Sequence, residues 1–369
     1  MSFCGKFTKV EKRMGDFSRK IFYTLLGKVF RNKPKSVPLE VSKNAKILIF
    51  RYDKIGDMVV SLPSFEFLKE KFPDSEIWVL ASPINFFLLE NYPYVDHFVV
   101  LPKGIFKKIK TLLQLRKVKF DIIINYVFYR TTKAGLWANL INPKAIKVNI
   151  GHNARNKIYS KLFNVLYPIS LRGKVPMSEL LCQYICWLFD FPYDKEISKR
   201  YFINVPPESL ETARSFLSNV PGSRKILINI SARRKWSSEN YKRLLSLIIQ
   251  DFKDLGIIFI AHPSDYKTLD EIVQNYNNNV FAFKSGKDFL DAIALVSLVD
   301  LVFTPDTSIV HFANAFGKPI VMMYYEKDSY LNEWIPNKSK FICVVSGCSN
   351  NYNDISPSDA FENIKALLE

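Results

Sequence analysis

The stretch that decides the fold covers residues 46–72, KILIFRYDKIGDMVVSLPSFEFLKEKF. It opens with Ile47–Phe50, a short apolar run typical of an interior strand of a parallel sheet. The segment Arg51–Asp57 has no apolar periodicity, and apolar side chains then recur at helical spacing as far as Leu68. The pattern predicts a strand, a loop and a helix.

Three residues of this unit have predicted local roles. Gly56 allows a sharp turn or a close approach of the backbone. Asp57 lies where the helix is expected to begin, and a carboxylate there stabilises free backbone N–H groups. Taken alone, Asp57 is explained most simply as a helix cap, with a catalytic carboxylate as the alternative. Pro63 lies too deep for a first-turn proline and is expected to kink the helix.

The composition is that of a globular protein with two domains. The chain has 369 residues, of which 48% are hydrophobic and 24% charged. No uninterrupted apolar run approaches the length of a bilayer-spanning helix, and Lys28 and Arg31 interrupt the only apolar cluster near the N-terminus. Five cysteines in so long a chain indicate no disulfide framework. A reducing, cytoplasmic compartment is therefore expected.

The net charge of +17 is concentrated in the first half of the chain. Residues 1–46 carry a net +9 and residues 103–178 a net +15, whereas the second half is nearly neutral. Such a distribution predicts a polyanionic partner on that side: a membrane surface, a phosphorylated glycolipid or a nucleic acid. No RNA-binding signature accompanies the charge, and core strands account for the interleaved aromatic residues, so nucleic acid is disfavoured.

Residues 1–45 form a predicted basic arm that precedes the first domain. An apolar stripe alternates with a cationic face, and the pattern suits an amphipathic helix lying on an anionic bilayer. A helix packed on the protein's own body explains the stripe equally well. Pro34 and Pro38 mark the linker that follows. The stripe consists of Phe17, Ile21, Leu25 and Val29, and the cations are Arg19, Lys20, Lys28 and Arg31.

From residue 46 onward, predicted strands and helices alternate. The expected strands are 47–50, 76–80, 97–100, 120–125 and 145–150, then 225–230, 256–261, 280–282, 301–304 and 319–323. The expected helices are 58–68, 84–91, 106–116, 131–140 and 174–189, then 208–217, 239–252, 266–274, 289–296, 308–316 and 361–368. This alternation predicts an α/β protein with two doubly wound, Rossmann-like parallel-sheet domains, residues 46–205 and 206–369, that face a cleft. The last helix is either part of the second domain or packs back on the first.

Two polar segments follow strands of the second domain. Arg233, Arg234 and Lys235 come directly after one strand, where they form either a phosphate clamp or a solvated basic loop. Asp265 follows the next strand and either caps a helix or binds a ribose hydroxyl.

A third segment, Asp306-Thr307-Ser308, lies at a predicted helix N-terminus, where free N–H groups and the helix dipole attract anions. His311 lies one turn inside, on the face that returns toward the anion. A lone histidine is more often structural, but this one shares a strand-end loop with a carboxylate and two hydroxyl groups.

The sequence resembles glycosyltransferase family 9, the heptosyltransferases of lipopolysaccharide core synthesis. Phe50–Asp57, continuing to Pro63 and Phe72-Pro73, is similar to the family's opening motif. Asp306–His311, with Ala315 and Gly317-Lys318-Pro319, is similar to its second signature. The resemblance runs from about Lys46 to the last helix. It implies a GT-B fold, a donor held mainly by the C-terminal domain, and metal-free inverting transfer from ADP-heptose to a Kdo-bearing lipid A acceptor.

The resemblance also implies roles for single residues. Asp57 corresponds to the proposed catalytic base, with Arg51, Lys54 and Gly56 beside it on the acceptor side. The donor-binding positions implied are Arg233, Arg234 and Lys235, Asp265 as the ribose contact, and Asp306, Thr307, Ser308 and His311 in the diphosphate loop.

Two positions depart from the family pattern. Ser308 replaces the usual glycine, and Arg234 replaces a lysine two places before Trp236, which keeps the charge but alters its geometry. Both departures concern the identity of the donor more than the class of reaction.

The residues support this mechanism independently on one point. No Asp-X-Asp triplet occurs, so neither a metal nor another cofactor is expected, and cationic and helix-terminal groups would stabilise the diphosphate. We expect a peripheral enzyme on the cytoplasmic face of the inner membrane. The alternatives are a family relative that uses another nucleotide sugar for outer-core or capsule glycan, and a non-enzymatic basic protein that binds membranes or nucleic acid.

Overall fold

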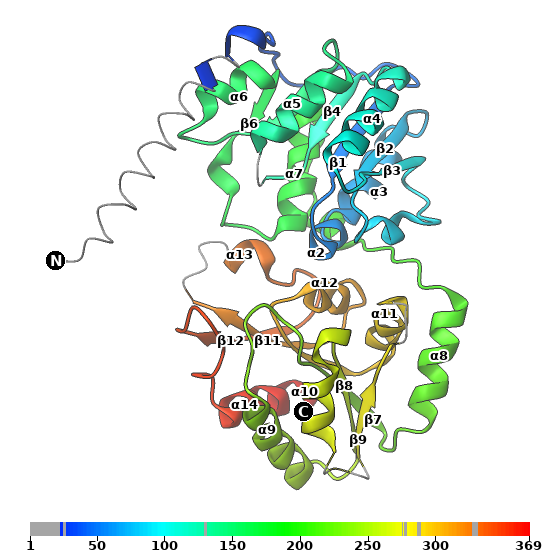
Figure 1. Cartoon of the computed structure of the whole chain (residues 1–369), viewed down its shortest axis with the longest axis vertical. Coiled ribbons are helices and arrows are strands. Elements are labelled where there is room, and N and C mark those ends of the chain that lie inside the picture. The colour runs from blue at the N-terminus through cyan, green and yellow to red at the C-terminus, as the bar shows by residue number, and fades with distance from the viewer. Residues whose placement is uncertain are drawn as a thin grey trace, which may run out of the picture.

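The protein folds into two parallel sheets, each covered by helices on both faces (Figure 1). The computed structural model describes residues 23–24, 27–128, 131–274, 276, 279–285, 289–326 and 331–369. Both sheets have six parallel strands and the same order, in which the first and fourth strands of the domain lie side by side at the centre. The two doubly wound domains predicted from the alternation are confirmed, and the sheets lie on either side of residues 205 and 206.

The first sheet has the order β3-β2-β1-β4-β5-β6. Its strands are β1 (Lys46–Arg51), β2 (Glu76–Ala81), β3 (His97–Val100), β4 (Ile122–Asn125), β5 (Ile146–Ile150) and β6 (Val165–Tyr167). Its helices are α2 (Ile55–Val59), α3 (Leu62–Lys71), α4 (Ile105–Leu115), α5 (Thr131–Ile141), α6 (Asn156–Leu162) and α7 (Met177–Phe189). Short 3-10 turns are η1 (Phe86–Leu89), η2 (Arg116–Val118), η3 (Ile169–Leu171) and η4 (Lys195–Lys199).

The second sheet has the order β12-β11-β10-β7-β8-β9. Its strands are β7 (Arg224–Asn229), β8 (Leu255–Ile260), β9 (Val280–Phe283), β10 (Leu301–Pro305), β11 (Ile320–Tyr325) and β12 (Phe341–Ser346). Its helices are α8 (Pro207–Ser218), α9 (Ser238–Asp251), α10 (Tyr266–Val273), α11 (Phe289–Leu298), α12 (Ser308–Ala315), α13 (Leu331–Trp334) and α14 (Pro357–Leu368), with the turn η5 (Pro263–Asp265). The last helix packs on α9 and on β10 to β12, within the second domain.

Several sequence predictions were wrong in detail. The helix expected over 58–68 is two helices, α2 and α3. Pro63 occupies the first turn of α3, where a backbone N–H has no acceptor within the helix, so the proline does not kink it. Residues 84–91 form only the short turn η1. Strands β6 and β12 and helices α6 and α13 were not predicted.

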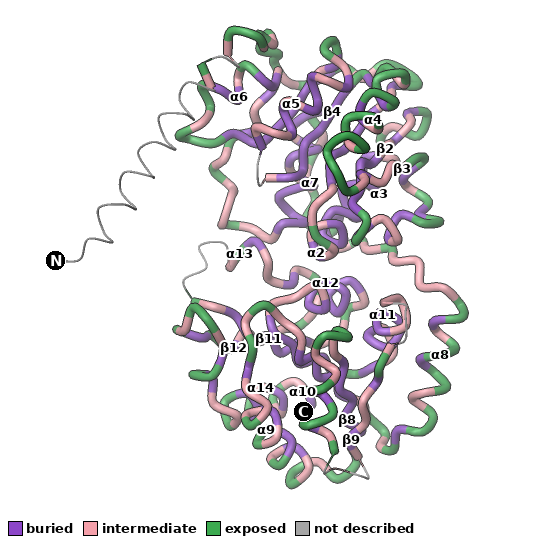
Figure 2. The backbone as a smooth tube through the Cα atoms, viewed as in Figure 1, coloured by how far each residue is buried: buried purple, intermediate pink, exposed green. Residues whose placement is uncertain are grey.

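The apolar core is continuous from one domain to the other. The central strands are almost wholly buried, and one cluster of buried side chains includes members of both sheets, such as Ile49 of β1 and Val302 of β10 (Figure 2). Phe87 of η1 meets Phe289 of α11 edge-on, with 6.2 Å between ring centroids. The buried cysteines Cys182 and Cys186 belong to this core.

The described part of the arm lies on the first domain. Tyr23 and Phe30 pack against α6, the Asn32 N–H donates to the Lys161 carbonyl at 3.2 Å, and the Leu39 N–H donates to the Leu188 carbonyl at 2.7 Å. Most of the predicted apolar stripe, including Phe17, Ile21 and Leu25, lies outside the described residues. Among the helices that the structure describes, none is long and apolar enough to cross a membrane.

Candidate functional site

The centre of the first sheet ends in a buried arginine. Arg51 is the last residue of β1 and is 1% exposed. Its Nη1 donates to the carbonyl of Tyr126 at 2.5 Å, just beyond the neighbouring strand β4, and its Nε donates to the carbonyl of Asp57 at 2.7 Å. The guanidinium thus connects the loop after β1 to the carboxyl end of β4. The strand order of the sheet reverses between β1 and β4, and open α/β sheets bind their ligands at such a position.

Asp57 is in the first turn of α2, and its two carboxylate oxygens have different surroundings. Oδ2 accepts a hydrogen bond from the backbone N–H of Lys54 at 3.3 Å, so the predicted capping role is real. Oδ1 lies 3.7 Å from Nη2 of Arg51. The side chain is 16% exposed, and an outside molecule can therefore reach it. Capping and catalysis are compatible here because the two roles use different oxygens.

A second carboxylate, Asp53, lies beside Asp57. Its Oδ2 accepts from Nη1 of Arg51 at 3.2 Å, and within the described residues its Oδ1 has no hydrogen-bond partner. Burial raises the pKa of Asp53 to about 7, against the opposing attraction of Arg51, and the charge of Asp57 adds to the rise. Beside Asp57 the site therefore contains a carboxyl group, that of Asp53, whose pKa lies near neutral pH.

The loop that carries these carboxylates is held by Asn85, which is fully buried. Its amide nitrogen donates to the carbonyl of Arg51 at 2.9 Å and to that of Lys54 at 3.3 Å, while its oxygen accepts from the Ser82 N–H at 2.8 Å. Asn85 thereby connects the end of β2 to the loop after β1. A buried polar side chain with all these partners fixes the backbone that positions Asp57.

In the second domain, Asn229 joins the two central strands at their carboxyl ends. It is the last residue of β7, and its amide donates to Thr304 Oγ1 at 3.0 Å and to Thr307 Oγ1 at 3.2 Å. Thr307 caps α12 by accepting from the N–H of Ile309 at 3.3 Å. Helix α12 begins at Ser308, directly after Asp306 and Thr307, as predicted, and its N-terminus is fixed at the carboxyl ends of the two central strands.

The three predicted cations of the segment after β7 have different environments. Arg233 is exposed, whereas Arg234 donates from Nε to the carbonyl of Ser349 at 2.9 Å and stacks on the Tyr325 ring at 4.6 Å. Lys235 forms an ion pair with Asp265 at 2.6 Å. The structure thus brings Asp265 together with the cationic segment, in which Lys235 is already paired with a carboxylate, and the phosphate clamp stays a prediction.

Asp265 does not act as a helix cap, one of its two predicted roles. It occupies the N-cap position of α10, but its carboxylate makes no cap hydrogen bond. Oδ2 accepts instead from Ser231 Oγ and from Lys235 Nζ, both at 2.6 Å. Although burial raises the pKa of Asp265, these hydrogen bonds outweigh it and the pKa is lowered. The residue is a fixed anion, and the ribose-binding role stays a prediction.

The two predicted motifs meet between the domains, where α2 contacts α12. The ring of His311 lies directly against Gly56, so that a Cβ at position 56 would be 2.5 Å from Cδ2 of the ring. Burial lowers the pKa of His311 to about 4, against the opposing attraction of Asp57, and the ring is neutral near pH 7. Position 56 therefore requires a glycine, because the His311 ring occupies the space that a Cβ at this position would take.

A second contact joins the domains at another position. Glu333 of α13 is 1% exposed, and its carboxylate accepts from the Arg172 guanidinium and, at 2.8 Å, from the Gly173 N–H. Trp334 beside it packs against His311, with 5.8 Å between ring centroids. This ion pair therefore fixes α13 on the first domain and supports the position of the histidine ring.

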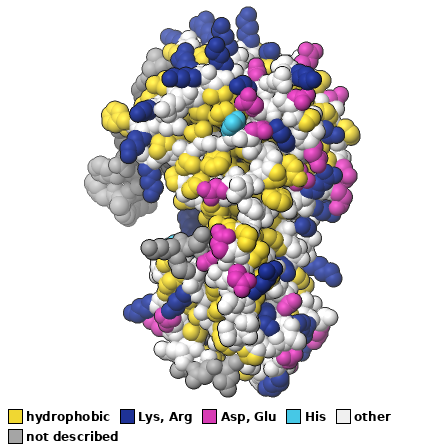
Figure 3. Space-filling view, turned by 90° about the vertical axis from the view of Figure 1, so that its right-hand side faces the viewer, with side chains coloured by type: hydrophobic (Ala, Val, Ile, Leu, Met, Phe, Trp, Pro, Cys, Tyr) yellow, Lys and Arg dark blue, Asp and Glu magenta, His cyan; other side chains and the backbone are white. Residues whose placement is uncertain are grey.

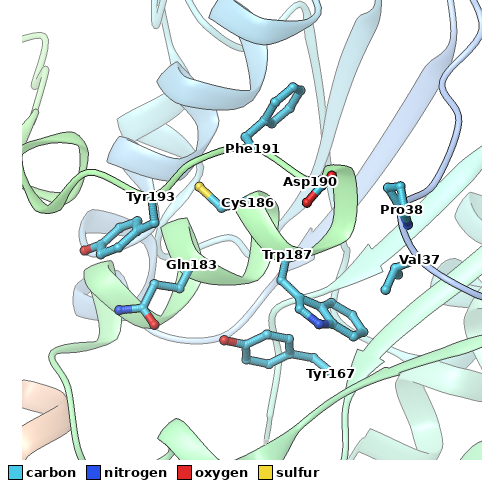
Figure 4. Close-up of a pocket in the computed structure, with 9 residues that line it drawn as sticks. All are labelled: Val37, Pro38, Tyr167, Gln183, Cys186, Trp187, Asp190, Phe191 and Tyr193. Atoms are coloured by element: carbon cyan, nitrogen blue, oxygen red, sulfur yellow. The ribbon is translucent and has the colours of Figure 1, made fainter.

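The predicted site does not coincide with a pocket of about 550 Å³ on the first domain (Figure 4). That pocket lies between α7 and the arm, where Trp187 packs against Tyr167 of β6 and Val37 and Pro38 form the opposite wall. None of the predicted site residues line it. Among the described residues, no cluster of three or more His, Cys, Asp or Glu side chains could hold a metal ion.

Asp53, Asn85, Asn229, Arg172 and Glu333 were not among the predicted site residues. A signal was present for two of them: Asn229 ends an apolar strand, and Asp53 lies in the same loop as Asp57. The other three become visible only when distant parts of the chain come together.

The fold and the two motifs define a glycosyltransferase of the GT-B type, and the chain belongs to glycosyltransferase family 9 (heptosyltransferase), which it matches over residues 113–364. The lipopolysaccharide heptosyltransferase 1 of Campylobacter coli is 22% identical, over 80% of this chain and 89% of that protein.

Solved structures show the same fold. A glycosyl transferase of family 9 from Veillonella parvula superposes with a TM-score of 0.73 at 16% identity, covering 89% of this chain and 98% of that one. The ADP-heptose lps heptosyltransferase II of E. coli superposes with a TM-score of 0.67 at 18% identity, covering 88% and 98%. The expected resemblance is confirmed, and the chain is a glycosyltransferase of the heptosyltransferase family of lipopolysaccharide core biosynthesis.

Proposed function

We propose that this enzyme transfers a heptose, with inversion, from ADP-heptose to the Kdo- or heptose-bearing inner core of a lipopolysaccharide or lipooligosaccharide. The donor is inferred from the E. coli protein named above, and the acceptor from the lipopolysaccharide relatives. The charge of the first half of the chain supports a phosphorylated acceptor. We place the enzyme at the cytoplasmic face of the inner membrane, where such an acceptor is accessible.

The observation that carries the proposal is the contact of His311 with Gly56. It brings a carboxylate of the first domain next to the helix N-terminus of the second. One side can therefore accept a proton while the other stabilises an anion. A sugar donor whose diphosphate lies at α12 presents its anomeric carbon toward Asp57, and this arrangement suits displacement of the diphosphate from the opposite face.

In the proposed reaction, an acceptor hydroxyl oxygen forms a bond to the anomeric carbon as the bond from that carbon to the diphosphate oxygen breaks. Asp57 takes the hydroxyl proton as general base. The negative charge that develops on the diphosphate is stabilised by the backbone N–H group of Ser308 and the dipole at the start of α12, and by Arg233 and Arg234. No step needs a metal ion.

The variant Asp57→Asn tests the general base. Asparagine keeps the shape of the side chain and an oxygen that can cap α2, so the fold and ADP binding are expected to persist. Transfer should fall by about 10²–10⁴-fold, the usual contribution of a general base. The matched control Asp74→Asn alters an exposed carboxylate and should leave transfer unchanged. Near-normal turnover of Asp57→Asn would reduce Asp57 to a helix cap.

The variant Arg234→Ala tests the donor clamp. Calorimetry with ADP should show weaker binding by about tenfold or more, because hydrogen bonds to charged groups each contribute about 1.5–3 kcal/mol. The exposed Arg243, which pairs with Glu239 on α9, provides the matched control Arg243→Ala. Unchanged ADP affinity in the Arg234 variant would make the cationic segment a solvated loop.

Ser308 and Arg234 favour a second candidate, a family member that uses another nucleotide sugar, because both departures lie in the donor site. A thermal-shift screen of nucleotide sugars separates the two. A donor present at 100 times its Kd stabilises the protein by roughly 2.7 kcal/mol. The largest shift with a donor other than ADP-heptose would replace the heptose assignment and leave the transfer mechanism intact.

A further inference from the structure

Helix α4 exposes apolar side chains that a helix of a globular domain normally buries. It packs beside α5 and buries only Leu112 and Leu115. Four other apolar residues face solvent: Ile105 is 60% exposed, Phe106 85%, Ile109 40% and Leu113 44%. Among the described residues, eight large apolar side chains are exposed, and half of them belong to this one helix.

These four side chains form one strip along the helix. Ile105, Ile109 and Leu113 follow one another at intervals of four residues, and Phe106 lies beside them. With 3.6 residues per turn, the four positions cover an arc of about 100° on one side of α4. The strip adjoins the buried face, so it continues the core outward as a single apolar surface and is not a set of scattered contacts.

The segment that carries the strip is basic and contains no carboxylate. Residues 101–120 contain no Asp or Glu and seven basic residues: Lys103, Lys107, Lys108, Lys110, Arg116, Lys117 and Lys119. Lys107 and Lys110 are exposed on the same helix. A helix surface of this kind matches an anionic lipid bilayer: the apolar side chains match the acyl chains, and the cations match the phosphates of the headgroups.

The position of α4 relates this surface to the site. The helix follows β3, and the carboxyl end of β3 lies at the same edge of the parallel sheet as the carboxyl end of β1, which precedes Asp57. Ile105 and Phe106 begin α4 and therefore lie toward the site (Figure 1). The space-filling view shows apolar and cationic side chains side by side on this face of the first domain, with Asp and Glu side chains also present on it (Figure 3).

We propose that the α4 surface, defined as Ile105, Phe106, Ile109 and Leu113 with the seven surrounding cations, docks the enzyme on an anionic membrane. The apolar strip enters the headgroup region, and the lysine side chains reach the lipid phosphates. The proposal rests on the proposed function in one respect: a lipid-linked acceptor would lie in the same surface, next to the entrance of the site.

Other partners fit this surface less well. A second copy docked through the same surface would bring two sets of cations together, and like charges across an interface oppose association. A nucleic acid would neutralise the cations but would leave the apolar strip against phosphates and water. An anionic bilayer satisfies both the cations and the apolar strip.

The test is co-sedimentation of the full-length protein with vesicles that contain no acceptor, made either of phosphatidylglycerol and phosphatidylethanolamine or of phosphatidylcholine alone. Lys107→Gln with Lys110→Gln should lower partitioning to anionic vesicles about 25-fold, since each cation near such a surface contributes about fivefold. Phe106→Ser with Ile109→Ser should lower it by about tenfold or more. Neither pair of changes should alter transfer to a soluble, delipidated acceptor.

Matched controls lie on the second domain. Val345→Ser removes an exposed apolar side chain, and Lys253→Gln with Lys267→Gln removes two exposed cations, all far from α4 in the chain. These variants should sediment as the parent does.

Wild-type partitioning of the α4 variants, or equal binding of the parent to both kinds of vesicle, would overturn the proposal. The proposal would also be overturned if gel filtration showed that Phe106→Ser converts a dimer to a monomer while vesicle binding persists, because the surface would then be a dimer interface. Because the vesicles contain no acceptor, failure of docking and failure of the transfer function give different results.

Discussion

Replacing Gly56 by alanine tests whether the two motifs meet in solution as they do in the structure. The new Cβ would lie 2.5 Å from Cδ2 and 3.1 Å from Nε2 of His311. The ring would have to withdraw by about 1 Å, and Trp334 packs on it, so the domains themselves must shift. Overpacking of this kind costs about 1–3 kcal/mol, which corresponds to a loss of roughly 5- to 150-fold in kcat/KM.

A double-mutant cycle isolates the contact. In the His311→Ala background there is no ring to displace, so adding Gly56→Ala should change kcat/KM by less than about twofold from that background. Three readouts apply to each variant: ADP release in the presence of donor and acceptor, thermal unfolding, and the radius of gyration from small-angle scattering. Gly27→Ala is the matched control, because the nearest atom to its new Cβ is 3.9 Å away.

The reasoning would be refuted if Gly56→Ala lowered kcat/KM equally in both backgrounds, because the loss would then not depend on the imidazole ring. Full activity of Gly56→Ala alone, with an unchanged radius of gyration, would likewise show that the enzyme works without this contact.

Three further predictions concern charged groups. Glu333→Gln removes the buried carboxylate that pairs with the Arg172 guanidinium, so the protein should lose up to about 3 kcal/mol of stability or open between its domains. Either effect would be seen as a lower Tm or a larger radius of gyration. Glu239→Gln, in an exposed ion pair, should change stability by less than about 0.5 kcal/mol. Burial raises the pKa of Asp53 from 3.8 to about 7, so between these pH values the folded state binds a proton that the unfolded state has lost. The stability of the parent relative to Asp53→Asn should therefore fall as pH rises from about 4 to 7. A difference in unfolding free energy that stays constant with pH, measured with denaturant, would contradict this. Burial lowers the pKa of Lys147 from 10.5 to about 8, so between these pH values the unfolded state binds a proton that the folded state has lost. The stability of the parent relative to Lys147→Met should therefore rise between pH 8 and 10.5 when it is measured with denaturant.

The sequence was most informative where one local pattern determined the structure. The run Ile47–Phe50 is buried in β1 because an interior strand of a parallel sheet is apolar on both faces. Strand β6 was missed because it has only three residues, and β12 because the connection before it contains no helical pattern beyond the four residues of α13. A short element gives too few positions for a periodicity to be recognised.

The site was predictable within each loop but not between loops. Thr307 at a helix start and Asp57 in a first turn follow from capping chemistry, which is local. The bond from Asn229 to Thr307 spans 78 residues, and the pair of Arg172 with Glu333 spans 161. Such contacts depend on how the domains pack, and no spacing in the sequence encodes them.

The core that continues from one domain into the other has a consequence for how the chain is synthesised. Phe87 belongs to the first domain, but its partner Phe289 follows the end of that domain, residue 205, by 84 residues, which a ribosome adds in roughly 4–17 s. During that interval the first domain can already be folded while the apolar edge that later meets the second domain has no cover. Nascent chains of this enzyme therefore expose an apolar surface for a limited time, and we expect chaperones to bind them at this edge until translation is complete.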